Sequence, residues 1–170
     1  MRKPKPLEST EDAFLYALRL LSRRAYSSFE IQKKFRLRAL PEASSSEVLE
    51  RLRAKKFLND RLLAEQFILS RSSLRWSPLR IERSLLQKGL DRALFKPLLL
   101  EAFSGAQEKE NAKETLLRQK QRFLRKKKGT AWDLKRKAWD FLVRKGYSRE
   151  AARLAVGDVF GYNSGLPEED

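Results

Sequence analysis

Apolar residues recur at helical spacing between short polar turns along most of the chain. The first such segment begins at Ser9 or Thr10, and its apolar stripe runs from Phe14 to Leu21 at the i, i+3, i+4, i+7 positions of an amphipathic helix. Further segments of the same kind follow to about residue 160. No segment alternates apolar and polar residues over the length of a strand. The pattern therefore predicts an all-α fold.

One pattern occurs three times. A capping Ser or Thr opens an amphipathic helix, and a Lys-Gly-apolar sequence closes it. The clearest copy spans residues 77–91, a second spans 130–148, and a degenerate copy spans 27–40. A repeat spacing of about 45–55 residues predicts a stack of similar helical units. The glycines are interpreted as helix stops rather than as phosphate-binding residues.

The repeat pattern predicts a division into three tandem three-helix repeats. The first nine residues are expected to be a flexible basic arm, because Pro4 and Pro6 resist helix formation and nothing apolar anchors them. The last nine residues are expected to be a frayed acidic tail. The predicted boundaries are 1–9 for the arm, 10–57, 58–104 and 105–161 for the repeats, and 162–170 for the tail.

Three local features refine this prediction. Ser44 and Glu47 have the spacing of a capping box, which predicts a helix start there. Pro97 would cost about 3 kcal/mol inside a helix, so the helix after Asp91 is expected to begin with a loose turn. A single long helix is predicted over residues 112–128, with its apolar face ending near Leu124.

Composition narrows the classes of function. The 170 residues carry a net charge of +16 with a pI near 10.4, which favours phosphate backbones, anionic membranes or acidic proteins as partners. The chain has no Cys and no His, so disulfides, thiolate metal sites and the commonest general base are absent. No apolar stretch approaches the roughly 20 residues of a membrane span, and no signal peptide is evident. A cytoplasmic protein is expected.

The acidic residues do not form a convincing catalytic group. Glu108, Glu110 and Glu114 are the densest set, and their spacing is typical of a solvated helix surface. The chain has no phosphate-cradling glycine loop, no metal-binding motif and no serine with a base to activate it. We expect no enzymatic activity, no cofactor and no metal ion.

The distribution of positive charge indicates a binding surface. A run from Arg125 to Lys128 precedes Lys135, Arg136 and Lys137, and in antiparallel helices the two clusters would flank one turn. A second basic corner brackets Trp76. Solubility alone is the simpler explanation of one lysine run, but two runs that meet across a turn favour an anionic partner. Trp132 and Trp139 could stack on bases, although their spacing is more typical of core packing. The predicted contacts are Arg71, Arg75, Arg80, Lys126, Lys127, Lys128, Lys135, Arg136 and Lys137.

Three segments resemble the RecX family. The most specific is residues 58–67 together with the Lys-Gly-Leu sequence at 88–90. Residues 17–31 resemble the family's opening, and residues 141–148 are similar to its last repeat. The resemblance extends from about residue 11 to 160. The chain departs from the family pattern at 38–41, where Arg-Ala-Leu-Pro stands in place of the usual glycine, and at 61–63.

The resemblance implies an elongated, curved rod of tandem three-helix repeats. It also implies a regulator of the RecA recombinase, active in recombination, DNA repair and the SOS response. Such a protein binds in the groove of the RecA–single-stranded-DNA filament and commonly inhibits strand exchange and ATPase activity. The implied partners are the RecA filament and single-stranded DNA, with double-stranded DNA as a further candidate, and the protein is expected to be a monomer without membrane contact.

Two other hypotheses remain open. The chain could be a stand-alone nucleic-acid-binding helical protein without sequence specificity and without a filament partner. It could also be a protein scaffold whose charge serves only solubility.

Overall fold

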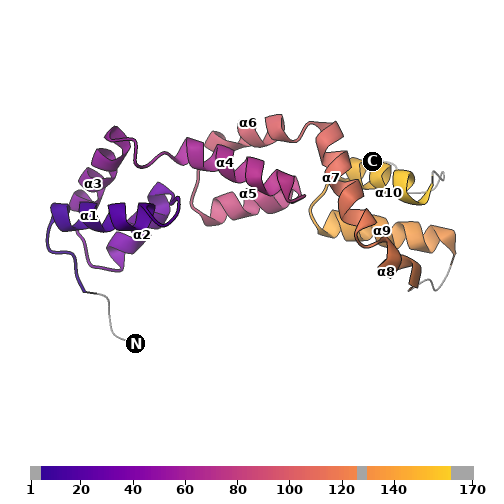
Figure 1. The fold of residues 1–170 in the computed structure, drawn as a ribbon, viewed down its shortest axis with the longest axis horizontal. Helices are drawn as coiled ribbons and strands as arrows, with labels where there is room; N and C mark the ends of the chain where they lie inside the picture. The colour runs from indigo at the N-terminus through magenta and orange to yellow at the C-terminus, as the bar shows by residue number, and fades with distance from the viewer. Residues whose placement is uncertain (1–4, 126–129, 162–170) are drawn as a thin grey trace. The chain divides into compact units, whose positions relative to one another are not determined.

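The computed structural model describes residues 5–125 and 130–161, and within these ranges it contains α-helices and no strand (Figure 1). The all-α prediction is confirmed. The helices of the described ranges are α1 (Thr10–Leu21), α2 (Ser28–Arg36), α3 (Glu42–Ala54), α4 (Asp60–Ser73), α5 (Pro78–Gln87), α6 (Arg92–Ala102), α7 (Gly105–Leu117), α8 (Lys120–Arg125), α9 (Ala131–Arg144) and α10 (Arg149–Phe160).

The helices form two compact units. The N-terminal unit comprises Met1–Phe67 and Leu85–Phe95, and the C-terminal unit comprises Ile68–Ser84 and Lys96–Asp170. Helices α4, α5 and α6 therefore contribute residues to both units. The division into three repeats stays a prediction.

In the N-terminal unit, α1 and α2 pack against α3 around one apolar core. Phe14, Ile31 and Leu52 come from three different helices and are all buried in this core. Leu7 packs on the same core, and its backbone N–H donates to the Arg38 carbonyl at 3.1 Å. The expectation that nothing apolar anchors the arm is therefore wrong for Leu7.

Most of the predicted helix starts are confirmed. Ser9, Ser27, Ser77 and Ser148 accept hydrogen bonds from backbone N–H groups three residues on. The predicted capping box of Ser44 is wrong, because α3 begins at Glu42, directly after Pro41. A proline loses nothing at a helix start, since the N–H that it lacks has no partner there.

Helix α6 also differs from the prediction, because it begins at Arg92 and continues through Pro97. Phe95 and Leu99 are both buried and lie one helical turn apart on either side of the proline. Burial of such side chains stabilises a fold by about 1.5–3 kcal/mol each, which offsets the cost of the proline. The helix therefore continues where local preference alone predicts a loose turn.

A serine–carbonyl joint connects two helix ends in the N-terminal unit. The Ser27 hydroxyl accepts from the Glu30 backbone N–H at 3.1 Å and donates to the Lys88 carbonyl oxygen at 2.5 Å. That carbonyl lies just past the end of α5, where a helix leaves acceptors without an internal partner. Gly89 follows with φ +71°, and a Cβ at this position would overlap the Phe29 ring.

The C-terminal unit contains the same joint. The Ser77 hydroxyl accepts from the Arg80 backbone N–H at 3.3 Å and donates to the Lys145 carbonyl at 2.5 Å. Gly146 follows with φ +90°, and a Cβ there would lie 2.9 Å from Leu79 Cβ. The interpretation of the glycines as helix stops is confirmed, and the structure adds a second reason for them: the neighbouring helix start lies too close for a side chain.

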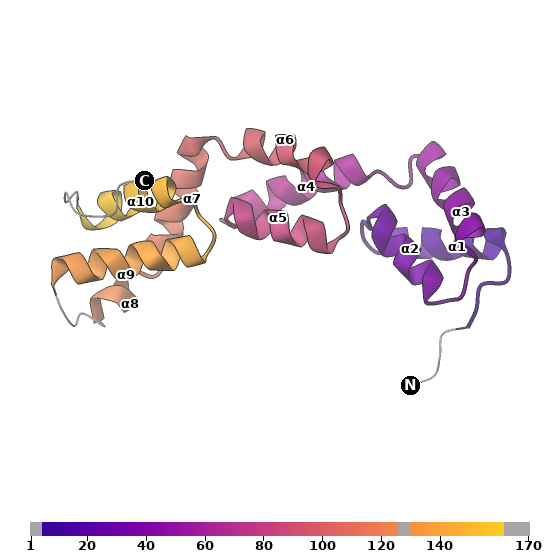
Figure 2. The ribbon, with the colours of Figure 1, turned by 180° about the vertical axis from the view of Figure 1, so that it is seen from behind.

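Helices α7, α9 and α10 pack together in the C-terminal unit around a core that includes Leu116, Leu142 and Val156. The single long helix predicted here is wrong. The α-helical run of α7 ends at Leu117, and α8 begins at Lys120 and lies against both α7 and α9 (Figure 2). Because α8 turns away from the axis of α7, Phe123 reaches α9 and the basic residues of α8 lie beside those of α9.

Candidate nucleic-acid interface

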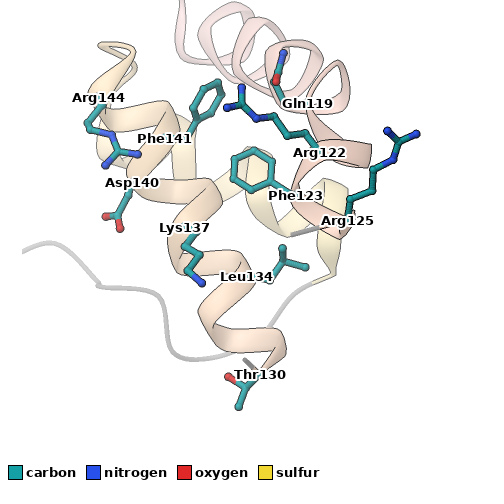
Figure 3. A pocket seen from close by; sticks show the side chains of 10 residues that line it. All are labelled: Gln119, Arg122, Phe123, Arg125, Thr130, Leu134, Lys137, Asp140, Phe141 and Arg144. Atoms are coloured by element: carbon teal, nitrogen blue, oxygen red, sulfur yellow. The ribbon is translucent and has the colours of Figure 1, made fainter. Parts of the chain in front are cut away.

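A hollow of about 940 Å³ lies between α8 and α9, and we call it the α8–α9 hollow (Figure 3). Four of its lining residues are cationic and one is a carboxylate. Its lining consists of Gln119, Arg122, Phe123, Arg125, Thr130, Leu134, Lys137, Asp140, Phe141 and Arg144. Cations therefore line both helices, while apolar side chains lie between them.

Two aromatic rings lie between the helices of the hollow. Phe123 of α8 and Phe141 of α9 meet edge to face, with their ring centroids 5.6 Å apart and their planes at 73° (Figure 3). This is a favourable arrangement for aromatic pairs. Lys145 also approaches the Phe141 ring, with its Nζ 5.6 Å from the centroid. The contact between the rings packs α8 against α9.

Local hydrogen bonds set the ends of the two helices. The backbone N–H of Gln119 donates to the Leu116 carbonyl at 2.9 Å, which closes the turn after α7. The Gln119 carbonyl accepts from the Phe123 N–H at 3.1 Å, which is the first hydrogen bond of α8. At the start of α9, the Thr130 and Asp133 side chains form a reciprocal capping box. The hydrogen bond from the Thr130 backbone N–H lowers the pKa of the Asp133 carboxyl, so its negative charge stays at the positive end of the helix.

The predicted cluster on α9 is only partly exposed. Arg136 and Lys137 are exposed, and Lys137 lines the hollow. Lys135 is only 6% exposed, because it shares the buried face of α9 with Ala138 and Leu142. Its place on the exposed basic surface is therefore a wrong prediction, since the helix turns by about 100° per residue and three consecutive residues cannot share one face. Lys126, Lys127 and Lys128 lie outside the described residues.

The second predicted basic corner forms a stack around Trp76. The Arg80 guanidinium lies 3.7 Å from the centroid of the indole, and that of Arg71 lies 5.0 Å from it. Such cation–π contacts hold arginines in place over an aromatic face. Arg80 is exposed and Arg71 is half-buried. The structure brings these three residues together, as the sequence indicated.

Arg75 has a structural role that the sequence did not reveal. Its guanidinium donates to the Glu114 carboxylate of α7, and this hydrogen bond lowers the pKa of Glu114. Its carbonyl accepts from the Tyr147 hydroxyl at 2.6 Å. Arg75 thus ties the α4–α5 turn to α7, and its guanidinium already has an anionic partner. Glu114 is likewise an ion-pair partner rather than a plain solvated residue, which corrects its interpretation.

The tryptophans of α9 differ in environment. Trp139 packs against the core and donates its indole N–H to the Arg149 carbonyl at 3.3 Å. Trp132 is 41% exposed, with the Arg136 guanidinium 5.2 Å from its ring centroid. Core packing is therefore the correct interpretation for Trp139 alone.

Sequence reasoning did not find the hollow itself. Arg122 and Arg125 lie one turn apart on either side of Phe123, a spacing that could have indicated a basic surface. The predicted long helix continued without a break, so it did not place these residues beside α9. No sequence pattern indicated Arg144 or Asp140, because they line the hollow only when α8 packs beside α9. Among the described residues, no group of three or more carboxylates is placed to hold a metal ion, and no helix is long and apolar enough to cross a bilayer.

The described residues define an all-α protein that displays a basic hollow and whose helix ends are connected by a repeated serine–carbonyl joint. Residues 13–52 match the family model described as the first three-helix domain of RecX, and residues 59–96 match that of the second. The regulatory protein RecX of Haemophilus influenzae strain PittEE is 30% identical over 152 residues, which cover 89% of this chain and 94% of that protein. The chain belongs to the RecX family.

Other relatives agree with this assignment. The regulatory protein RecX of Bacillus cereus strain AH820 is 28% identical over 153 residues, which cover 89% of this chain and 55% of that protein. A crystal structure of RecX from Lactobacillus salivarius superposes with a TM-score of 0.80 at 19% identity, over 88% of this chain and 96% of that one. A second crystal structure, of a regulatory protein RecX, superposes with a TM-score of 0.74 at 23% identity, over 84% of this chain and 70% of that one. The two structures share the fold of this chain.

Proposed function

We propose that this chain binds the RecA–single-stranded-DNA filament and lowers its strand-exchange and ATPase activities. Membership of the RecX family supports this proposal most directly, because the relatives named regulatory protein RecX match over nearly their whole length in Haemophilus influenzae. RecA as the partner follows from the family resemblance of the sequence.

The charge of the C-terminal unit is consistent with a filament partner. A nucleoprotein filament carries a phosphate backbone, and basic side chains gain affinity for such a backbone by releasing its counterions. The α8–α9 hollow and the Arg71–Trp76–Arg80 stack provide two basic surfaces in one unit. The hollow offers cations on two helices, so a bound strand would be held from both sides.

The ATPase activity of RecA on single-stranded DNA tests the proposal. Wild-type protein should lower the rate of ATP hydrolysis at concentrations near that of the filament. Reversing two charges of the hollow, Arg122→Glu with Lys137→Glu, should raise the concentration needed for half-inhibition at least ten-fold. The matched control is Lys33→Glu with Lys55→Glu, which makes the same charge change at exposed residues of the N-terminal unit. An unchanged ATPase rate with wild-type protein would refute the proposed function.

A second candidate function is stand-alone binding of nucleic acid. The aromatic rings of Phe123 and Phe141, which line the basic hollow, favour it because bases can stack on such rings. Binding of the wild-type protein to bare and to RecA-coated single-stranded DNA distinguishes the two functions. Preference for the coated strand supports filament regulation. Preference for the bare strand, with no effect on the ATPase, supports the stand-alone function.

A further inference from the structure

The α8–α9 hollow combines two chemical features, cationic side chains and aromatic rings. Arg122 of α8 and Lys137 of α9 both line the hollow, and Arg144 lines it nearer the C-terminal end of α9 (Figure 3). The half-buried Phe123 and Phe141 rings lie between these cations. A ligand of the hollow therefore meets positive charge at its edges and an aromatic surface at its centre.

The size of the hollow favours a polymer over a single small anion. Its volume of about 940 Å³ lies at the upper end of the range of about 300–1,000 Å³ for small-molecule sites. Lys137 and Arg144 are seven residues apart, which places them about 10 Å apart along α9. Successive phosphates of one strand can contact both cations, whereas a single small anion leaves most of the hollow unfilled.

The aromatic floor favours a nucleic acid over an acidic peptide. Every base has a flat face that can stack on a phenyl ring, whereas a carboxylate side chain has no comparable surface. Since Lys145 already lies over the Phe141 ring, Phe123 is the better stacking platform. Asp140 is the one carboxylate of the lining, and it can accept hydrogen bonds from the amino groups of bases while it repels phosphate.

We propose that the α8–α9 hollow binds single-stranded nucleic acid directly, with a base against Phe123 and neighbouring phosphates at Arg122, Lys137 and Arg144. A duplex offers phosphates to these cations but no free base face to Phe123, because its bases are stacked on one another. This inference rests on the proposed function in one respect: within the filament, the hollow is assigned to the single-stranded DNA and not to RecA.

Fluorescence anisotropy with a labelled oligothymidylate of about eight nucleotides, a length typical of single-strand sites, tests the proposal on the full chain without RecA. Wild-type protein should bind it at least about ten-fold more tightly than an abasic strand of equal length, because the abasic strand lacks the stacking contribution. Arg122→Gln and Lys137→Gln should each reduce the slope of log K against log salt by about 0.7, the value for one phosphate contact to a single strand.

The controls separate binding at the hollow from general charge and from misfolding. Lys33→Gln with Lys55→Gln should leave the affinity nearly unchanged. Phe123→Leu keeps an apolar side chain in the core and should remove most of the preference for thymidylate over the abasic strand. Photocrosslinking of a bromodeoxyuridine strand to unmodified protein should label peptides of α8 or α9, which requires no variant to fold.

Three outcomes would overturn the proposal: equal affinity for abasic and normal strands, equal affinity for a duplex, or displacement by polyglutamate as readily as by the oligonucleotide. The last outcome would identify an acidic protein segment as the ligand. If the wild-type protein inhibits RecA but the hollow does not bind the oligonucleotide, this inference alone is refuted. Binding at the hollow without any effect on RecA would refute the proposed function alone.

Discussion

At the residue scale, five of the described helix ends share one backbone conformation, and the ends of α2, α5 and α9 show that it does not require one residue type. Ala39, Gly89 and Gly146 have φ of 55°, 71° and 90°, and each donates its N–H to the carbonyl three residues earlier. The residue after each donates to the carbonyl five residues before it, which completes a Schellman motif. Ala39 thus occupies the position where the family resemblance led us to expect glycine.

The difference between these ends lies in what touches them. At Gly89 and Gly146 the start of another helix occupies the space that a Cβ would need. Ala39 is exposed, so its methyl group costs only backbone strain. Glycine is therefore required at the two joints and merely preferred at the end of α2.

We predict that Gly89→Ala destabilises the protein by more than about 1–2 kcal/mol, the usual cost of a left-handed alanine, because the new methyl group also displaces Phe29. Urea unfolding followed by far-UV circular dichroism measures this change. Gly105→Ala is the matched control, since Gly105 lies at the start of α7 and nothing lies within 4 Å of an added Cβ. Equal effects of the two substitutions would contradict the packing of Phe29 against the α5 end.

Ala39→Gly is predicted to stabilise the protein by about 0.5–1 kcal/mol. Relief of the left-handed strain contributes about 1–2 kcal/mol, and the greater freedom of glycine in the unfolded chain removes part of that gain. The same urea titration detects the change as a higher midpoint with an unchanged slope. A lower midpoint would mean that the φ of Ala39 is not strained.

At the scale of elements, the two joints place the C-terminal end of one helix on the N-terminal end of another. The end of α5 meets the start of α2, and the end of α9 meets the start of α5. The partial charges of the two helix ends are opposite, so the contact is electrostatically favourable as well as hydrogen-bonded. One serine satisfies both helices, because its hydroxyl accepts from its own helix and donates to the other.

Ser77→Ala is therefore predicted to cost about 2 kcal/mol, because it removes a cap and leaves the Lys145 carbonyl without its donor. Ser9→Ala is the matched control: it removes only a cap, from the exposed start of α1, and should cost about 1 kcal/mol. Tryptophan fluorescence monitors the first change selectively, since all three tryptophans belong to the C-terminal unit. Equal costs would show that the joint contributes nothing beyond the cap.

Glu30 makes the joint of the N-terminal unit sensitive to acid. Burial acts to raise the pKa of its carboxyl, but hydrogen bonds from Arg24 and the Ser27 N–H, together with the charge of Lys88, outweigh it and lower the pKa below 4.5. Stability from a lowered pKa is fully present above the unfolded value and is lost as the pH falls through the folded value. We predict that Glu30→Gln lowers the melting temperature at pH 7 and that the difference from wild type vanishes well below pH 4. A constant difference at all pH values would contradict this account.

At the scale of the whole molecule, the net charge of +16 makes binding to an anionic polymer sensitive to salt. We predict that the logarithm of the association constant for single-stranded DNA falls linearly with the logarithm of salt concentration, with a slope of about −0.7 for each phosphate contacted. Filter binding at several salt concentrations measures this slope. A slope near zero would support the scaffold hypothesis, in which charge serves only solubility.

The sequence was most informative wherever local chemistry decides the structure. Ser27, Ser77 and Gly146 have the same roles in the structure as in the prediction, because caps and left-handed ends depend on residues within one helical turn. The start of α3, the course of α6 and the break before α8 were not predicted. Burial of Phe95 and Leu99 outweighs the tendency of Pro97 to interrupt a helix. Sequence rules for helix ends do not include the free energy of such burial.

The amino-acid sequence by itself determined the all-α class, the family and the abundance of positive charge. These follow from periodicity, local motifs and composition, which are properties of the chain alone. Tertiary structure decided which charges face outward together: it buries Lys135, pairs Arg75 with Glu114 and brings Arg122 and Lys137 into the lining of one hollow. Only the last of these outcomes depends on the direction in which α8 leaves α7. That direction is set by packing between helices rather than by residues near the turn.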